Sequence, residues 1–104
     1  MEKTKFSKHM TMDRLERYAT IATKVGFGET VMTSTCSIFG EHRKHRNLEL
    51  TSTGVCIVRD PDGTIITMYC AKLSVVKAWF TTERLSKELF TIIRRNERLG
   101  YCDL

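Results

Sequence analysis

The chain of 104 residues lacks most of the features that assign a protein to a class at first sight. It contains no run of about 20 apolar residues, the length that a helix needs to cross a bilayer. One proline and six glycines, with 41% hydrophobic residues, exclude collagen-like and low-complexity chains and argue against global disorder. The P-loop, the complete G-x-G-x-x-G fingerprint, the H-E-x-x-H helix and the G-x-S-x-G elbow are all missing. Nucleotide-driven motors and zinc-protease chemistry are therefore set aside.

The start of the chain and its cysteines predict the compartment. Residues 1–9 are polar and basic, and the apolar segment of a secretory signal does not follow them. We expect them to be a flexible lead-in to a single domain that spans residues 1–104 in the cytoplasm. The four cysteines form no C-x-x-C pair, so we expect buried free thiols, no metal and no cofactor.

The spacing of apolar residues predicts helices at both ends of the chain. Residues 11–25 carry one apolar stripe, with Thr11 as the N-cap and Gly26 as the stop. A short helix capped by Ser74 and a longer one from Thr82 follow later in the sequence. Residues 29–39 fit a helical period but are rich in β-branched residues. We favour a short helix there, with a strand as the alternative.

From residue 46 to residue 70 the apolar pattern changes to a period of two. Turn residues at 52–54 and 60–63 separate three stretches, which predicts an antiparallel meander. The whole order predicts an α+β fold, with N-terminal helices, a three- to four-stranded antiparallel sheet and a C-terminal helix packed on one face.

Pairing of Asp60 with Thr64 across the second turn would set the register of that hairpin, with Val58 opposite Ile66 and Cys56 opposite Met68. The covered face would then carry Leu48, Leu50, Cys56, Val58, Ile66, Met68 and Cys70. The open face would carry His45, Asn47, Glu49, Thr51, Val55, Ile57, Arg59, Ile65, Thr67 and Tyr69. The open face reads either as an ordinary solvated surface or as a binding surface, and a slip of one residue would reverse the assignment.

Basic residues indicate a polyanionic partner. The chain has 17 Lys and Arg against 12 Asp and Glu, a formal net charge of +5, which favours RNA or another polyanion. Residues 41–46 are a solvated loop on the ordinary reading and a phosphate-binding segment on the sharper one. The phosphate-binding candidates are Arg43, Lys44, Arg46 and Arg59. Arg94, Arg95 and Arg98 suit the end of a helix, and we expect Trp79 and Phe80 to anchor the core.

Catalysis is the sharpest reading of the same region. Metal-independent RNA cleavage requires a base, an acid and a cation around one phosphate. The candidates for acid or base are His42 and His45, with Glu49, Thr67 and Tyr69 as auxiliary groups. At about 3.3 Å per residue, His45 and Glu49 lie too far apart along one strand to act together.

Three stretches of sequence resemble a known group. Ser7 to His9, the arginine-bearing helix at 13–18 and the strand at 62–69 resemble small prophage proteins grouped with the barnase–colicin–RelE-like nuclease fold. The resemblance implies a four-stranded antiparallel sheet, whose fourth strand would lie within residues 29–39, and RNA cleavage without metal. It also implies that His9, Arg14, Arg17 and Thr67 belong to the site.

These observations give one hypothesis and two rivals. The first is a small cytoplasmic RNA-binding protein of phage or mobile-element type, with metal-independent endoribonuclease activity as its finer form. The second is a non-enzymatic inhibitor that binds a host or defence protein. The third is a small-ligand module with the half-polar sheet face as its pocket. The sequence leaves the oligomeric state open, a dimer included.

Overall fold

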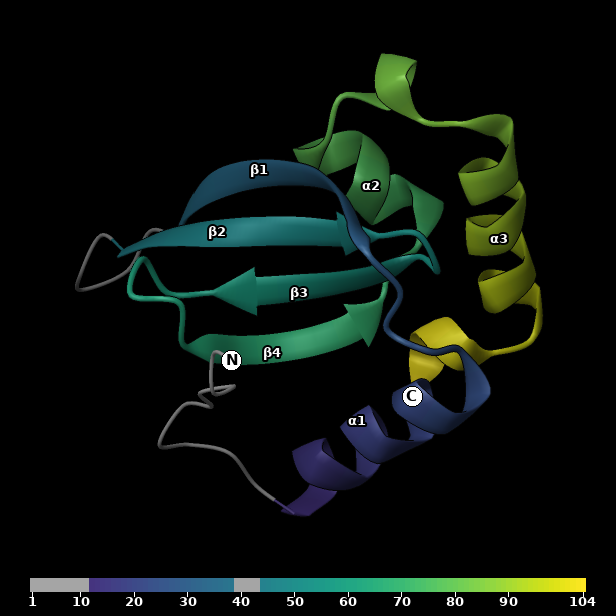
Figure 1. The fold of residues 1–104 in the computed structure, drawn as a ribbon, viewed down its shortest axis with the longest axis horizontal. Helices are drawn as coiled ribbons and strands as arrows, with labels where there is room; N and C mark the ends of the chain where they lie inside the picture. Colours follow the sequence, from purple (N-terminus) through teal and green to yellow (C-terminus); the bar gives the residue numbers. More distant parts are fainter. Residues whose placement is uncertain (1–11, 39–43) are drawn as a thin grey trace.

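The computed structural model describes residues 12–38 and 44–104. Four strands form one antiparallel sheet in the order β1-β2-β3-β4, which confirms the α+β class (Figure 1). The elements are α1 (Met12–Lys24), β1 (Thr30–Ile38), β2 (Lys44–Thr51), β3 (Val55–Arg59), β4 (Ile65–Cys70), α2 (Leu73–Trp79), the short 3₁₀ helix η1 (Thr82–Arg84), α3 (Lys87–Arg98) and the 3₁₀ helix η2 (Tyr101–Asp103). Within the described ranges, no helix has both the length and the apolar character that crossing a membrane demands.

The helix favoured for residues 29–39 is wrong, because this stretch contains β1. Its residues pair with β2 from Thr30 opposite Thr51 to Ile38 opposite Lys44. Met32 fits both periods, since a strand also turns it toward the core, where it packs against the residues beneath α2 and α3. The β-branched residues of this stretch were therefore the more informative signal.

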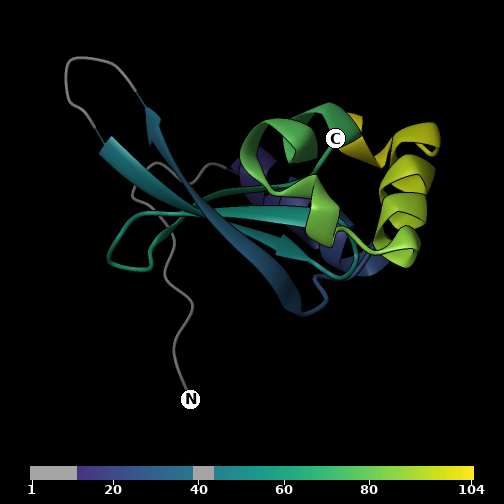
Figure 2. The same ribbon diagram turned by 90° about the horizontal axis from the view of Figure 1, so that it is seen from above.

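The C-terminal helix packs on one face of the sheet, as expected, and α1 covers the other face. On one face, Leu48, Leu50, Cys56 and Val58 pack with residues of α2 and α3. Successive residues of a strand point to opposite faces, and the intervening Val55 and Ile57 pack with Tyr18 and Ile21 of α1. Figure 1 shows α1 running beside β4, and Figure 2 shows β1 and β2 extending away from the helices.

A β-bulge overturns the predicted register of the second hairpin. Asp60 N donates to Thr64 O at 2.9 Å, as expected, and Arg59 pairs with Ile65. Val58 then pairs with Thr67 instead of Ile66, because β4 holds one extra residue at this point.

The bulge changes which residues of β4 face each helix layer. Met68 and Cys70 join the core beneath α1, whereas Ile66 and Tyr69 pack toward α2 and α3. The predicted pairing of Cys56 with Met68 is therefore wrong, since Cys56 pairs with Tyr69.

The tight turn between β2 and β3 is tied to α3. Asn96, only 1% exposed, donates from Nδ2 to Thr53 O at 2.9 Å. Gly54 adopts φ +85°, and a Cβ there would approach Asn96 Nδ2 to 2.9 Å. Thr51 Oγ1 accepts a hydrogen bond from Val55 N at 3.1 Å. The turn needs glycine at residue 54 both for its backbone and for the close approach of α3.

Candidate nucleic-acid interface

The structure does not bring the predicted catalytic residues together. His42 lies outside the described residues, and His45 is exposed on β2. Glu49 lies on β2 and Thr67 on β4, with β3 between them, a separation of about 10 Å at the usual strand spacing. Tyr69 packs on the opposite face, toward α2 and α3, so its predicted place on the open face is wrong.

Glu49 belongs to a polar network across three strands. Arg59 Nε donates to Glu49 Oε1 at 2.9 Å, and Thr30 Oγ1 donates to Glu49 Oε2 at 3.0 Å. Arg59 Nη1 also donates to Gly63 O at 2.9 Å, which holds the β3–β4 turn. Because both oxygens of the carboxylate accept hydrogen bonds from protein, this network reads as a structural support of the sheet rather than a base awaiting substrate.

The other predicted phosphate-binding residues divide in the same way. Arg46 forms an ion pair with Asp60, and its side chain is only 12% exposed. Both Arg46 and Arg59 thus have their charges matched by carboxylates. Arg43 and the side chain of Lys44 lie outside the described residues. Arg46 and Arg59 therefore do not provide an unmatched positive charge for a phosphate group.

Three residues that the resemblance implied do meet, where α1 packs against β4. Arg17 Nη2 donates to Thr67 Oγ1 at 3.0 Å, and Arg14 Nη1 donates to Ile66 O at 3.3 Å. Tyr18 OH donates to the same Thr67 oxygen at 3.3 Å. We call Arg14, Arg17, Tyr18 and Thr67 the α1–β4 cluster. His9, the fourth implied residue, lies outside the described residues.

The guanidinium of Arg17 is the polar centre of this cluster. Its Cζ lies 5.5 Å from the ring centroid of Tyr18, within the range of a cation–π contact. Its Nε is buried and finds no hydrogen-bond partner among the described residues. No carboxylate in the described ranges pairs with Arg17. A guanidinium held in place, with no described carboxylate to match its charge, is a group suited to binding phosphate.

Residue spacing alone could have placed Tyr18 in the cluster. It lies four residues after Arg14, so the two share a helix face. The contact with Thr67, about fifty residues away in the sequence, leaves no local signal.

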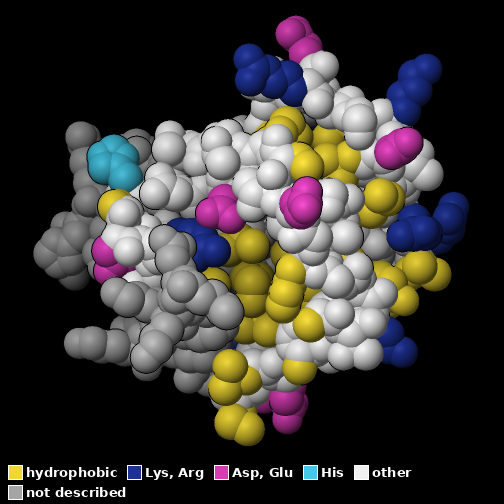
Figure 3. Space-filling view, viewed as in Figure 1, with side chains coloured by type: hydrophobic (Ala, Val, Ile, Leu, Met, Phe, Trp, Pro, Cys, Tyr) yellow, Lys and Arg dark blue, Asp and Glu magenta, His cyan; other side chains and the backbone are white. Residues whose placement is uncertain are grey.

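An apolar hollow lies beside the cluster. It has a volume of about 440 Å³ and is lined by residues of α1, of the connection from α1 to β1 and of the sheet, among them Leu15, Ala19, Phe27, Ile57, Ile65 and Met68. Figure 3 shows hydrophobic side chains gathered at its base, next to charged groups. The small-ligand hypothesis placed its pocket on this face of the sheet, but the hollow is more apolar than the half-polar surface that the sequence predicted.

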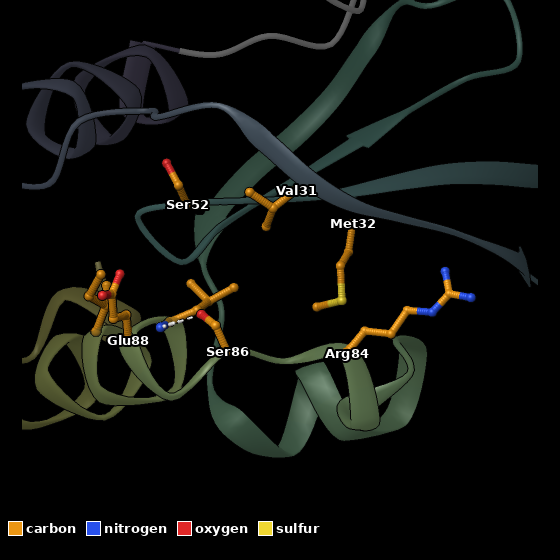
Figure 4. Close-up of a pocket in the computed structure, with 8 residues that line it drawn as sticks. Val31, Met32, Ser52, Arg84, Ser86 and Glu88 are labelled. Carbon is orange, nitrogen blue, oxygen red and sulfur yellow. Dashed lines mark hydrogen bonds between the residues drawn. The ribbon is translucent and has the colours of Figure 1, made fainter.

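A second cleft separates β1 from the start of α3. Val31 and Met32 line it from β1, and Arg84 and Glu88 from the helical side. Figure 4 shows the side chains of Arg84 and Glu88 at opposite ends of this cleft. Ser86 is occupied as the N-cap of α3, since its Oγ accepts from Leu89 N at 3.1 Å. The mixed charge makes the cleft a poor site for phosphate.

Among the described residues, the net positive charge lies in the last third of the chain. Residues 71–104 hold seven Lys and Arg against four Asp and Glu, whereas the described residues before 71 hold six of each. Arg94 Nη1 lies 3.7 Å from Glu97 Oε2, and Lys72 pairs with Asp103.

The two aromatic residues that were expected in the core differ in burial. Phe80 is buried as expected, but Trp79 is 43% exposed, so its predicted place in the core is wrong.

The cysteines are free where the structure describes them. Cys56 and Cys70 are buried and Cys102 is half-buried. Burial raises the pKa of the Cys70 thiol. Burial, with the nearby Cys70, raises the pKa of Cys102 to about 11. Among the residues that can be placed, no three His, Cys, Asp or Glu side chains gather where they could hold a metal ion.

Comparisons with known proteins add no name to this site. No family model, no curated protein and no solved structure matches the chain. Only the geometry and charge of the residues themselves therefore point to a function.

Proposed function

We propose that this chain is an RNA-binding protein and that its α1–β4 cluster contacts the phosphate backbone. The observation that carries the proposal is Arg17, a guanidinium oriented by Thr67 and Tyr18 with no carboxylate beside it among the described residues. Arg14 comes from the preceding turn of the same helix and reaches the neighbouring residue of β4. The net charge of +5 supports a polyanionic partner.

Binding has more support than cleavage. Glu49 is bound to Arg59, and Tyr69 packs in the core on the other face, so these two do not join the α1–β4 cluster. Metal-independent endoribonuclease activity is the finer form of the proposal, with His45 as its described acid or base. It is tested by incubating tRNA with the protein in EDTA. Intact tRNA with both the wild type and His45→Ala would refute cleavage and leave the binding proposal standing.

Salt titration of RNA binding tests the main proposal. Fluorescence anisotropy with a labelled single-stranded RNA should show affinity that falls steeply as salt rises, because phosphate contacts release counterions. Arg17→Gln should weaken binding and lower the slope of log K against log salt by about 0.7, the value for one phosphate contact on a single strand.

The matched control removes a charge from the same helix outside the cluster. Lys24→Gln takes one cation from the last turn of α1 and should leave the affinity nearly unchanged. A wild-type protein that does not bind RNA, or Arg17→Gln behaving as Lys24→Gln does, would contradict the proposal.

A second candidate function is supported by one feature of the sheet. β1 is an edge strand of nine residues without a charged side chain, and its Val31 is 51% exposed. Such an edge can pair with an extended segment of another protein. This would suit the alternative of an inhibitor that binds a host or defence protein. Binding through main-chain hydrogen bonds should depend little on salt, which distinguishes it from RNA binding.

A further inference from the structure

A groove between α2 and the start of α3 has the chemistry of a nucleotide-binding site. It encloses about 260 Å³, and its more buried lining residues are Leu73 and Leu85. Lys77 from α2 and Lys87 and Phe90 from α3 also line it, and none of its lining residues is acidic. The groove therefore combines a small apolar floor with two positively charged side chains.

Neither lysine of this groove is accounted for by an ion pair. Lys77 and Lys87 are both exposed, and within the described part of the chain neither pairs with a carboxylate. Lys87 also occupies the first residue of α3, where the helix dipole disfavours a cation. Its charge therefore does not stabilise this end of the helix through the dipole and is available to a negatively charged ligand.

Exposed aromatic rings lie on the same helices. Phe90 is 44% exposed and lies three residues after Lys87, on the same side of α3. Trp79, at the end of α2, is 43% exposed. Aromatic rings of this kind stack on the unpaired bases of single-stranded nucleic acids, while basic side chains hold the backbone.

We infer that the groove binds single-stranded RNA, with a base stacked on Phe90 and the backbone phosphates held by Lys77 and Lys87. This inference rests on the proposed RNA-binding function and names the form of RNA that the protein would take. In Figure 1 the connection from α2 to α3 and the helix α1 lie on opposite sides of the sheet. A strand held at the groove therefore uses a surface separate from the α1–β4 cluster, so substitutions can test the two independently.

The test is the affinity of groove variants for a fluorescein-labelled 12-residue oligouridylate, followed by anisotropy. Phe90→Ala should weaken binding by about 5- to 150-fold, the usual loss when one stacking platform is removed. Phe90→Trp should keep the affinity, because the larger ring still stacks. The double variant Lys77→Gln with Lys87→Gln should lower the salt slope by about 1.4, or 0.7 for each phosphate contact.

The controls remove the same groups elsewhere. Leu99→Ala removes another exposed apolar side chain, at the far end of α3, and Lys24→Gln removes another exposed lysine, so both should bind nearly as the wild type does. Circular dichroism and urea unfolding of each variant exclude loss of the fold as the cause.

The outcomes separate the inference from the proposed function. A wild type that binds oligouridylate, with Phe90→Ala and the lysine variant equal to their controls, would overturn the groove and leave RNA binding intact. A wild type that binds no RNA would refute the proposed function, and the inference would fall with it. Loss in Phe90→Ala with retention in Phe90→Trp is the result expected here.

Discussion

The two faces of the sheet are closed to different extents. Toward α2 and α3, the strands bury a continuous apolar layer in which Leu50, Val76 and Ile93 are fully inaccessible. Toward α1, one helix covers β3 and β4. The ion pair of Glu49 with Arg59 stays partly exposed on this face, and the apolar hollow lies next to α1. The first face is built for stability. The second combines a smaller core with exposed groups, and the α1–β4 cluster lies beside it.

The largest expected difference between the faces is in the cost of removing an apolar side chain. Ile93→Ala should lower the free energy of unfolding by about 2–5 kcal/mol, because Ile93 is inaccessible and its removal leaves a cavity. Leu15→Ala, at a residue of α1 that is 42% exposed, should change it by no more than about 0.5 kcal/mol. Urea unfolding of both variants measures the contrast, and equal losses would refute it.

The polar tie of α3 to the β2–β3 turn should show the next largest effect. Asn96→Ala removes the donor to Thr53 O and leaves that carbonyl without its partner, at a cost of about 1–3 kcal/mol in unfolding free energy. Asn47→Ala, at an exposed residue of β2, is the matched control and should be nearly neutral. An Asn96→Ala protein as stable as the wild type in urea would show that this hydrogen bond does not help to hold α3 on the turn.

The sequence predicted most accurately those elements that are determined by residues close together in the chain. The strands within 46–70 follow from alternating apolar residues and from turns whose glycines adopt positive φ, as Gly54 and Gly63 do. The sequence predicted that the last long helix begins at Thr82, but Thr82 begins the 3₁₀ helix η1. The N-cap of α3 is Ser86, and local sequence alone did not distinguish these two candidates. Outside residues 29–39, where a helix was favoured and β1 forms, local patterns thus gave the kinds of element and placed the boundaries within a few residues.

The prediction of which residues face each helix layer was wrong, because one extra residue in β4 reverses the facing of the residues that follow it. The bulge beside Val58 moves Met68 to the α1 side and Tyr69 to the other side, and nothing in the local sequence marks it. The α1–β4 cluster was equally hidden, because Arg17 and Thr67 are fifty residues apart. Only the resemblance had placed these two residues in one site, and the pattern of residues alone had favoured the loop at 41–46.

A smaller effect is expected from the polar contact that helps to hold α1 on its face of the sheet. Thr67→Val removes the oxygen that accepts from Arg17 and Tyr18, and we expect a loss of about 1 kcal/mol in unfolding free energy. Thr33→Val, at an exposed residue of β1, should cost nothing and serves as the control. If Thr67→Val is fully stable but binds RNA more weakly, Thr67 orients Arg17 for binding without holding the helix.

A last contrast concerns the thiol of Cys102, which packs against the core beneath α1. Burial raises its pKa from 9.0 to about 11, with the nearby Cys70 as the second cause. The thiolate is the reactive form of cysteine. At pH 9 about 1% of Cys102 is thiolate in the folded protein, against about half in the unfolded chain. Iodoacetamide labelling, resolved by peptide mass spectrometry, should be about 50-fold slower in the native protein than in urea.

The pH dependence of this protection has a definite sign. Between pH 9 and about pH 11 the unfolded chain releases the Cys102 proton while the folded chain keeps it. The contribution to stability is therefore complete below pH 9 and is lost as the pH rises toward 11. Equal labelling rates at pH 9 in the native and urea-unfolded protein would mean that water reaches Cys102 freely. The face of the sheet beneath α1 would then be more open than its buried neighbours Tyr18 and Ile21 indicate.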